Sequence, residues 1–213
     1  MGMKGSASAA ISVLVIVISA AAAFSVFADW ASETVTVSSS LLGSTAKTGS
    51  GTGLDVAGKD FFTEIDSGGN IVAVDDWHVY VPYAVLAIAA LTVIACAAGL
   101  ARGSKGAGSL AAGTVLGLAG AGVTAAFVLW DRFGTSEYSI LGVKTVYDVS
   151  PEFGAWMALA CFALVFILSL AGLAKSASGR RRRRCPCGIG RSPGRPVRDA
   201  DIRPGASARF YLS

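Results

Sequence analysis

Four long stretches of this chain contain no charged residue and no histidine. They cover residues 5–28, 79–101, 106–130 and 153–174. Each is long enough to cross a hydrocarbon core about 30 Å thick as a helix, and each is apolar all round, unlike the helices of a soluble domain. The pattern predicts an all-α membrane fold, a four-transmembrane-helix bundle with spans at residues 9–28, 80–101, 109–130 and 153–174.

The segments between the spans sort by charge. Residues 1–8, 102–108 and 175–213 together carry fourteen Lys and Arg against two acids, whereas residues 29–79 and 131–152 carry four against twelve. Because Lys and Arg near span ends stay on the cytoplasmic side, we expect both termini in the cytoplasm and two extracellular loops, in the plasma (cell) membrane. The net charge of +4 is therefore the sum of a basic cytoplasmic side and an acidic extracellular side, and it does not indicate nucleic-acid binding.

The first span is also compatible with a cleavable signal peptide. Lys4 gives it a basic start, and Val26, Phe27 and Ala28 resemble a small-residue cleavage site. Its apolar core is longer than that of a typical signal peptide, so we expect it to be retained. Cleavage would leave three spans with the same later topology.

The extracellular loops contain strand-like segments, so we expect a small β-rich region on top of the bundle, in which one antiparallel sheet uses all of these segments. Residues 33–37 alternate as a strand does, and residues 61–65 and 71–74 flank a turn-forming sequence. In the second loop, residues 138–141 and 143–149 surround Gly142. The Gly/Ser/Thr-rich segment 38–53 predicts an irregular, mobile connection. The four tryptophans, Trp30, Trp77, Trp130 and Trp156, are near outer span ends, where aromatic rings prefer the interface.

Small residues recur every four positions in the third span and define a helix-packing face. They are Gly113, Gly117, Ala121 and Ala125. Missing side chains let a second backbone come close. We expect packing within the bundle, with a homodimer contact or a partner helix as the alternatives.

The segment after the fourth span is strongly basic and is expected to be a disordered tail over residues 175–213. Its arginine run predicts contact with anionic lipid of the inner leaflet, each basic residue contributing about 1 kcal/mol; the alternative is an anchor that only fixes the orientation of the last span. The run consists of Arg180, Arg181, Arg182, Arg183 and Arg184. Cys185 and Cys187 follow, either as free thiols or as possible acylation sites, and Gly2 fits the loose myristoylation pattern.

The residue inventory predicts no catalytic, cofactor-binding or metal site. Phosphate-loop and zinc-protease motifs are absent, and the single histidine offers little general-base capacity. Asp75, Asp76 and His78 cluster beside Trp77, but they are too few for a metal site, so we expect solvated interfacial groups. The spans contain no ionisable group of the kind that ion-coupled transporters require.

The layout resembles the claudin-like tetraspan superfamily, which has four spans, a longer first outer loop and both ends inside. The residues that carry the resemblance are Trp30 after the first span, Glu152, Phe153 and Gly154 opening the fourth with Trp156 behind, and Cys185-Pro-Cys187 after it. The Gly-Leu-Trp motif and the paired first-loop cysteines of claudins are missing. The chain is equally similar to bacterial four-span membrane proteins of uncharacterised function, which also place a Trp after the first span.

These observations lead to a functional hypothesis. We expect a non-enzymatic tetraspan that organises or scaffolds membrane partners, other proteins or further copies of itself, with its polybasic tail on anionic lipid. The alternative is an accessory subunit of a transporter or channel complex, docked through the small-residue face of the third span.

Overall fold

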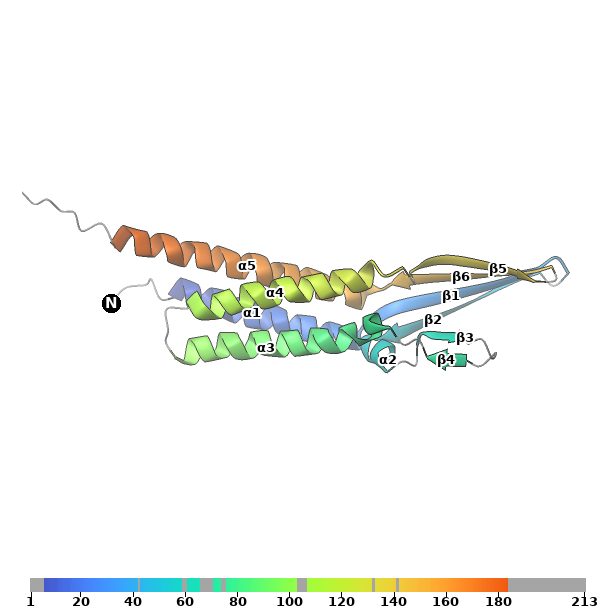
Figure 1. Ribbon diagram of the computed structural model, residues 1–213, viewed down its shortest axis with the longest axis horizontal. Coiled ribbons are helices and arrows are strands. Elements are labelled where there is room, and N and C mark those ends of the chain that lie inside the picture. The colour runs from blue at the N-terminus through green and yellow to red at the C-terminus, as the bar shows by residue number, and fades with distance from the viewer. Residues whose placement is uncertain are drawn as a thin grey trace, which may run out of the picture.

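The computed structural model of the chain is elongated, with a bundle of long helices from which a narrow β-sheet projects (Figure 1). It describes residues 6–41, 43–58, 61–65, 71–73, 76–102, 107–131, 133–140 and 142–183. The sheet lies at the end of the bundle opposite the N-terminus (Figure 1). We call this the sheet end.

Four long helices form the bundle. They are α1 (Ser6–Phe24), α3 (Val81–Ala101), α4 (Ala107–Val128) and α5 (Phe153–Arg183). All four are long and apolar enough to cross a membrane, over Ala9–Phe27, Trp77–Ala101, Gly108–Val128 and Phe153–Ser176. This confirms the prediction of four such helices, and it is compatible with an integral membrane protein.

The outer surface of the bundle is as apolar as its interior. On α3, Val85, Ala89 and Cys96 are buried, whereas Leu91 and Ile94 on the other side of the same helix are exposed. A helix of a soluble protein would place polar side chains on its outward face. Exposed apolar side chains over a whole bundle suit a surface that contacts lipid.

Contacts between helices arrange the bundle as a ring of four. The α1 helix packs along α3 and α5, and α4 packs along the same two helices. The α1 and α4 helices therefore lie diagonally opposite each other. This order brings the first and last spans into direct contact, although more than a hundred residues separate them.

A four-stranded antiparallel sheet continues from the bundle. Its strands are β1 (Asp29–Ser39), β2 (Gly43–Thr52), β5 (Gly134–Ile140) and β6 (Val143–Pro151), in the order β2-β1-β6-β5. The β1 and β6 strands pair at the centre from Ala31↔Pro151 to Ser39↔Val143. They are the strands attached to α1 and α5, so the contact between the first and last spans extends into the sheet.

Short elements fill the sheet end of the bundle. They are the 3₁₀ turns η1 (Ser25–Phe27) and η2 (Trp77–Tyr80), the helix α2 (Gly53–Ala57) and the hairpin of β3 (Thr63–Ile65) and β4 (Ile71–Ala73). The β3–β4 hairpin occurs where the sequence predicts one. It forms a separate two-stranded sheet, so the expectation of a single sheet that uses all the strand segments is wrong for this hairpin.

Two further expectations need correction. The segment 38–53 is not irregular, because Gly43–Thr52 forms β2 and pairs with β1 along its length. Its Gly-rich sequence has low strand propensity, and the pairing with β1 overrides that propensity. The expectation of a disordered tail from residue 175 is also wrong over its first part, since α5 continues past Ala174 to Arg183, and residues 184–213 lie outside the described residues.

The tight turns require glycine at two positions. Gly43 follows the β1–β2 turn with a φ of 79°, and Gly142 lies in the β5–β6 turn with a φ of 83°. Side chains with a Cβ rarely adopt this left-handed backbone region. Gly142 is the residue around which the sequence predicts the second hairpin, and that prediction is confirmed.

Candidate functional site

Trp30 joins the sheet to the bundle. It is the second residue of β1, and its side chain is fully buried. The indole Nε1 donates a hydrogen bond to Ser25 O at 2.7 Å, which satisfies its only polar atom. Its ring meets Phe127 of α4 edge-on, with centroids 5.2 Å apart. One residue thus fixes the base of β1 against η1 and α4.

Two glycines make room for the Trp30 ring. A Cβ on Gly154 would lie 2.5 Å from Trp30 Cδ1 and 2.8 Å from Asp29 O. A Cβ on Gly53 would lie 3.1 Å from the same ring atom and 2.8 Å from Val26 O. Backbone atoms surround both positions, so neither site has space for a side chain.

Glu152 completes the connection on the α5 side. Its backbone N–H donates to Trp30 O at 2.9 Å, and its Oε1 accepts from Ser32 Oγ at 2.5 Å. Trp30, Glu152 and Gly154, which carried the family resemblance in the sequence, therefore meet at one point. We call this set of contacts the joint.

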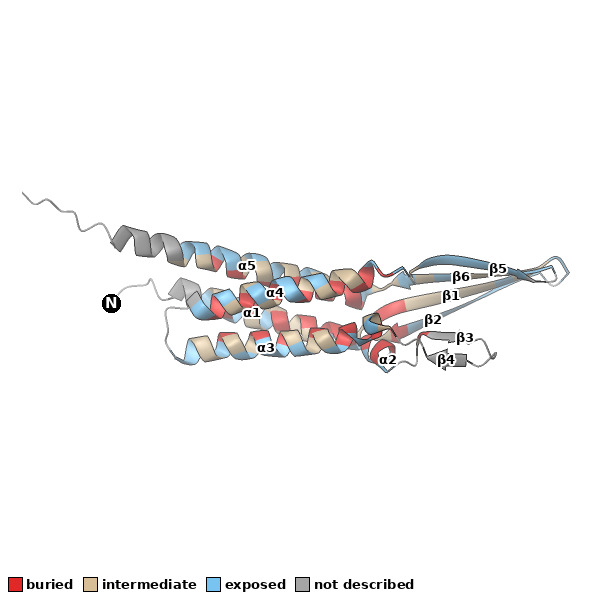
Figure 2. Cartoon of the chain, viewed as in Figure 1, coloured by how far each residue is buried: buried red, intermediate tan, exposed pale blue. Residues whose placement is uncertain are grey.

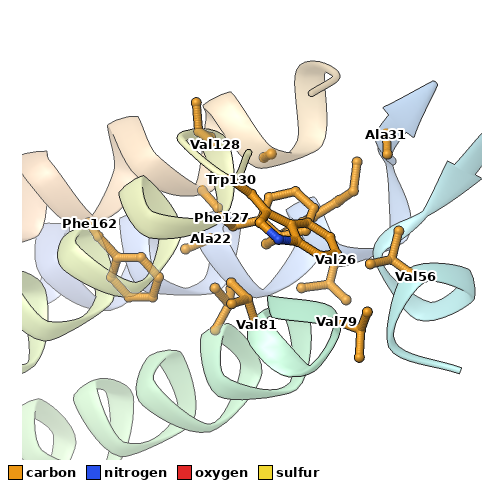
Figure 3. Packing of buried hydrophobic residues seen from close by; sticks show 14 of the residues in the cluster. Ala22, Val26, Ala31, Val56, Val79, Val81, Phe127, Val128, Trp130 and Phe162 are labelled. Carbon is orange, nitrogen blue, oxygen red and sulfur yellow. The ribbon is translucent and has the colours of Figure 1, made fainter. Parts of the chain in front are cut away.

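An aromatic layer extends the joint across the top of the bundle. Phe62 and Trp130 meet edge-on at 5.2 Å, and Phe127 and Phe133 do so at 5.3 Å. These residues belong to the main hydrophobic cluster of the protein, which also includes Phe162 of α5 (Figure 3). The layer packs the connecting segments at the sheet end on the helices, and these segments, residues 29–79 and 131–152, contain no cysteine.

The tryptophans do not share one environment. Trp30 and Trp130 are core residues, with exposed fractions of 0% and 3%, whereas 55% of Trp77 and 51% of Trp156 are exposed. The expectation that all four lie at a lipid interface is therefore wrong for Trp30 and Trp130. A sequence position just beyond a span end does not tell whether the ring points outward or into a loop core.

The histidine is part of this aromatic layer. The His78 ring stacks on Trp130 with centroids 4.7 Å apart, and Trp77 covers it at 3.8 Å. Asp76 Oδ1 lies 2.6 Å from His78 Nδ1 and also accepts from the His78 backbone N–H. Asp75 lies outside the described residues. In the described part of the chain, no group of three or more His, Cys, Asp or Glu is placed to hold a metal ion.

The large sheet has two chemically different faces. Side chains alternate between faces along a strand, and paired residues share a face. One face, the apolar face, bears Val35, Val37, Tyr138, Val143, Tyr147 and Val149, together with the charged Glu33 and Lys47. The other, the hydroxyl face, bears Ser32, Thr34, Thr36, Ser38, Ser44, Thr48, Ser50, Thr135, Ser139 and Ser150, together with the charged Glu137, Lys144 and Asp148. Hydrogen bonds join Thr34 to Thr48 at 3.0 Å and Ser32 to Ser150 at 3.1 Å on the latter.

Neither face of the sheet is covered by the described part of the chain. Apart from the base of β1 and Gly51 at the base of β2, the described sheet residues are intermediate or exposed (Figure 2). Tyr138 on the apolar face is 60% exposed and packs edge-on against Tyr147 at 5.8 Å. A sheet with an alternating pattern normally packs its apolar face on a core. This surface is the candidate interaction site of the molecule.

A short capped helix supports the base of β2. Thr52 and Asp55 form a reciprocal capping box at the start of α2, with Asp55 Oδ2 accepting from Thr52 N at 2.9 Å and from Thr52 Oγ1 at 2.8 Å. The hydrogen bonds from the side chain and the backbone of Thr52 lower the pKa of Asp55 below its ordinary value of 3.8.

The small-residue face of α4 is occupied by α5. A Cβ on Gly117 would lie 2.7 Å from Phe166 N, and one on Gly113 would lie 2.6 Å from Ser169 Oγ. Ala121 and Ala125 continue this face and are half-buried. The two glycines therefore pack within the bundle, and this part of α4 is not free for a partner helix.

Gly120 is a packing residue outside the four-residue repeat. A Cβ there would lie 2.6 Å from the Phe162 ring, closer than van der Waals contact allows. In the sequence, only its spacing of three residues from Gly117 indicated that Gly120 belongs to the packing face. Nothing in the sequence indicated that Phe162 of α5 would be the side chain that packs against it.

The arginine run lies mostly at the end of α5. Arg180 to Arg183 continue the helix, and the side chains of these four residues lie outside the described part of the chain. Arg184, Cys185, Cys187 and Gly2 fall outside the described residues altogether. Two cysteines are described, Cys96 and Cys161, and both are free thiols in the helices.

Comparisons with known proteins add no relative. No family model matches the chain, and no curated protein matches it. The functional proposal therefore rests on the four apolar helices, the joint and the sheet.

Proposed function

We propose that this chain is a non-enzymatic tetraspan membrane protein that organises or scaffolds membrane partners through its four-stranded sheet. In this arrangement the sheet lies outside the cell membrane, and the termini lie in the cytoplasm with the arginine run on anionic lipid. The observation that carries the proposal is the exposure of a long, two-faced sheet fixed to an apolar bundle.

The joint supports a display role. Trp30, Gly154 and Glu152 hold the base of the sheet through buried packing and backbone hydrogen bonds. The sheet therefore leaves the bundle in a fixed direction instead of hanging on flexible linkers. With a rise of about 3.3 Å per residue, the eleven residues of β1 extend about 36 Å. Such a support brings an interaction surface well clear of a membrane.

The length of α5 supports the lipid contact. With a rise of 1.5 Å per residue, Arg180 follows Ala174 by about 9 Å along the helix axis. This is about one Debye length at physiological ionic strength, so a basic residue there still experiences the surface potential of an anionic leaflet. Because the helix continues to Arg183, four of the five arginines are on the same helix as the span.

A pulldown with a truncated sheet tests the scaffold proposal. The variant replaces residues 36–46 and 137–146 with Asn-Gly turns, which retains the paired ends Val35↔Lys47 and Ser136↔Tyr147 and the whole joint. We expect membrane proteins that co-purify with the full chain in mild detergent to be lost with the truncated chain. The thermal unfolding midpoints of the two chains should agree, because the removed rows have no contact with the bundle core. The same partners with both chains would contradict the proposal.

A further inference from the structure

The two edges of the large sheet are open. Every residue of β2 from 43 to 50 is exposed, as is every residue of β5 from 134 to 139. An exposed edge strand presents unpaired N–H and C=O groups, which can pair with another strand. Neither edge strand contains a proline within these ranges, so the backbone donors are intact.

The two edges run in opposite directions. The β1 strand leaves the bundle and β2 returns to it, whereas β5 leaves the bundle and β6 returns. In the order β2-β1-β6-β5, one edge strand therefore points toward the bundle and the other points away. Copies in one membrane share an orientation, so β5 of one copy is antiparallel to β2 of the next. Contacts between two β2 strands or two β5 strands would be parallel, a slightly weaker pairing.

The register places both edges at the same height. Complete rows cross all four strands, from Gly134-Val149-Glu33-Gly49 near the bundle to Ile140-Val143-Ser39-Gly43 near the tip. If two sheets meet at equal height, the same rows continue from one copy into the next. Each residue of β5 then has a β2 residue of the neighbouring copy opposite it.

The residues that meet in these rows are compatible in size and charge. Tyr138 would face Thr45, and Glu137 would face Ala46, so large side chains meet small ones. Lys47 is the only charged residue of β2, and Glu137 is the only one of β5. Lys47 would face Ser136, in the row next to that of Glu137 and on the opposite face of the sheet, so no like charges meet across the edge.

We propose that β5 of one copy adds to β2 of a second copy, joining the sheets of neighbouring molecules into one continuous antiparallel sheet. This rests on the proposed function and names a second copy of the chain as the partner. The contact is head-to-tail, because two different edges meet. A series of joined molecules therefore keeps one free edge at each end unless the molecules close into a ring. All apolar faces lie on the same side of the joined sheet.

Cysteine pairs placed at the two edges test this contact in the full-length protein in membrane vesicles. Ser44 of β2 and Ser139 of β5 belong to one row, and both change conservatively to cysteine. Within one chain they lie three strand spacings apart, about 14 Å, beyond the reach of a disulfide. Native Cys185 and Cys187 are first replaced by serine, because no other cysteine lies outside the bundle.

Oxidation of the double variant Ser44→Cys/Ser139→Cys should give a ladder of dimers and larger species, and each single variant should stay monomeric. The matched control is Ser38→Cys/Ser139→Cys, since Ser38 lies in the same row on the inner strand β1, where β2 shields it. The control should give no ladder. Dimers from a single variant, an equal ladder from the control, or no ladder from the double variant would each overturn the inference.

A measurement on the unmodified chain avoids any disturbance of the sheet by the cysteine substitutions. Its native mass in lipid nanodiscs should correspond to more than one copy, and a monomer would also overturn the inference. The pulldown separates this failure from that of the proposed function. A partner lost on sheet truncation, together with a monomeric chain, would leave the scaffold proposal standing with a different protein on the sheet.

Discussion

At the scale of single residues, Trp30 connects the sheet to the bundle. It is fully buried, donates to Ser25 O and rests on Gly154, so it connects β1, η1 and α5 at once. Its position after the first span is visible in the sequence. Its burial is not, because that depends on the ring contacts made by Phe127 of α4.

Replacing Trp30 by Phe tests the joint. We expect a loss of about 1–3 kcal/mol in unfolding free energy, from the lost Nε1 hydrogen bond and the cavity left by the smaller ring. The matched control is Trp156→Phe, because Trp156 is largely exposed and its change should stay within about 0.5 kcal/mol. Thermal unfolding in detergent, followed by circular dichroism, measures both. Equal shifts for the two variants would contradict the assigned role of Trp30.

The Asp55 cap gives α2 a pH dependence. Because the pKa of Asp55 is lowered in the folded chain, its contribution is fully present above the ordinary value of 3.8 and is lost as the pH falls through the lowered pKa. We expect the hydrogen-exchange protection of the α2 amides to decrease over that acidic range, after correction for intrinsic exchange. In Asp55→Asn this acid-dependent decrease should be absent. A variant that keeps the same pH profile would show that another group is responsible.

At the scale of elements, the α4–α5 contact depends on missing side chains. Gly113, Gly117 and Gly120 bring α4 close to the backbone and side chains of α5. The repeat of small residues predicts a close contact but does not name the helix that makes it. The strand β2 shows the opposite case, since its sequence predicts an irregular loop and its partner β1 makes it a strand.

Gly117→Ala should lower the free energy of unfolding by about 1–3 kcal/mol, because the new methyl group would lie 2.7 Å from Phe166 N and backbone atoms cannot move aside as easily as a side chain. Gly122→Ala on the same helix is the control. A Cβ there meets nothing within 4 Å, so alanine should be neutral or slightly stabilising through its helix propensity. Unfolding midpoints in one detergent compare the two. Equal midpoints would show that α5 does not pack tightly on Gly117.

At the scale of the whole molecule, the chain divides into parts with different surfaces. The bundle is apolar outside, the sheet has an apolar and a hydroxyl face, and α5 ends in arginines. Each surface suits a different environment: lipid tails, other proteins and lipid head groups. The joint fixes the sheet to the bundle, so in the proposed arrangement a membrane around the bundle would orient the interaction surface.

The arginine run should dominate binding to anionic lipid. Replacing Arg180 to Arg184 with Gln in the full chain removes five positive charges, and at about 1 kcal/mol each the loss should abolish recruitment of anionic lipid. The readout is the number of phosphatidylserine molecules that stay bound to the detergent-purified protein by native mass spectrometry, with phosphatidylcholine as the lipid control. A matched protein control replaces Arg191, Arg195, Arg198, Arg203 and Arg209, which are farther from the span. Unchanged lipid retention in the first variant would refute the lipid contact.

The sequence by itself determined the local properties of this protein. Uncharged apolar runs define four helices, and Gly142 and the strand alternation around it define one hairpin. The charge distribution distinguishes the basic segments between the helices from the acidic ones. Hydropathy and turn chemistry act over a few residues, so each can be inferred from its own segment. Only the tertiary structure decided which segments meet: β1 with β6, Trp30 with Gly154, the α4 glycines with α5, and the Gly-rich segment with β1 as a strand. These contacts join residues far apart in the chain, and packing between them overrides the local propensity of either partner.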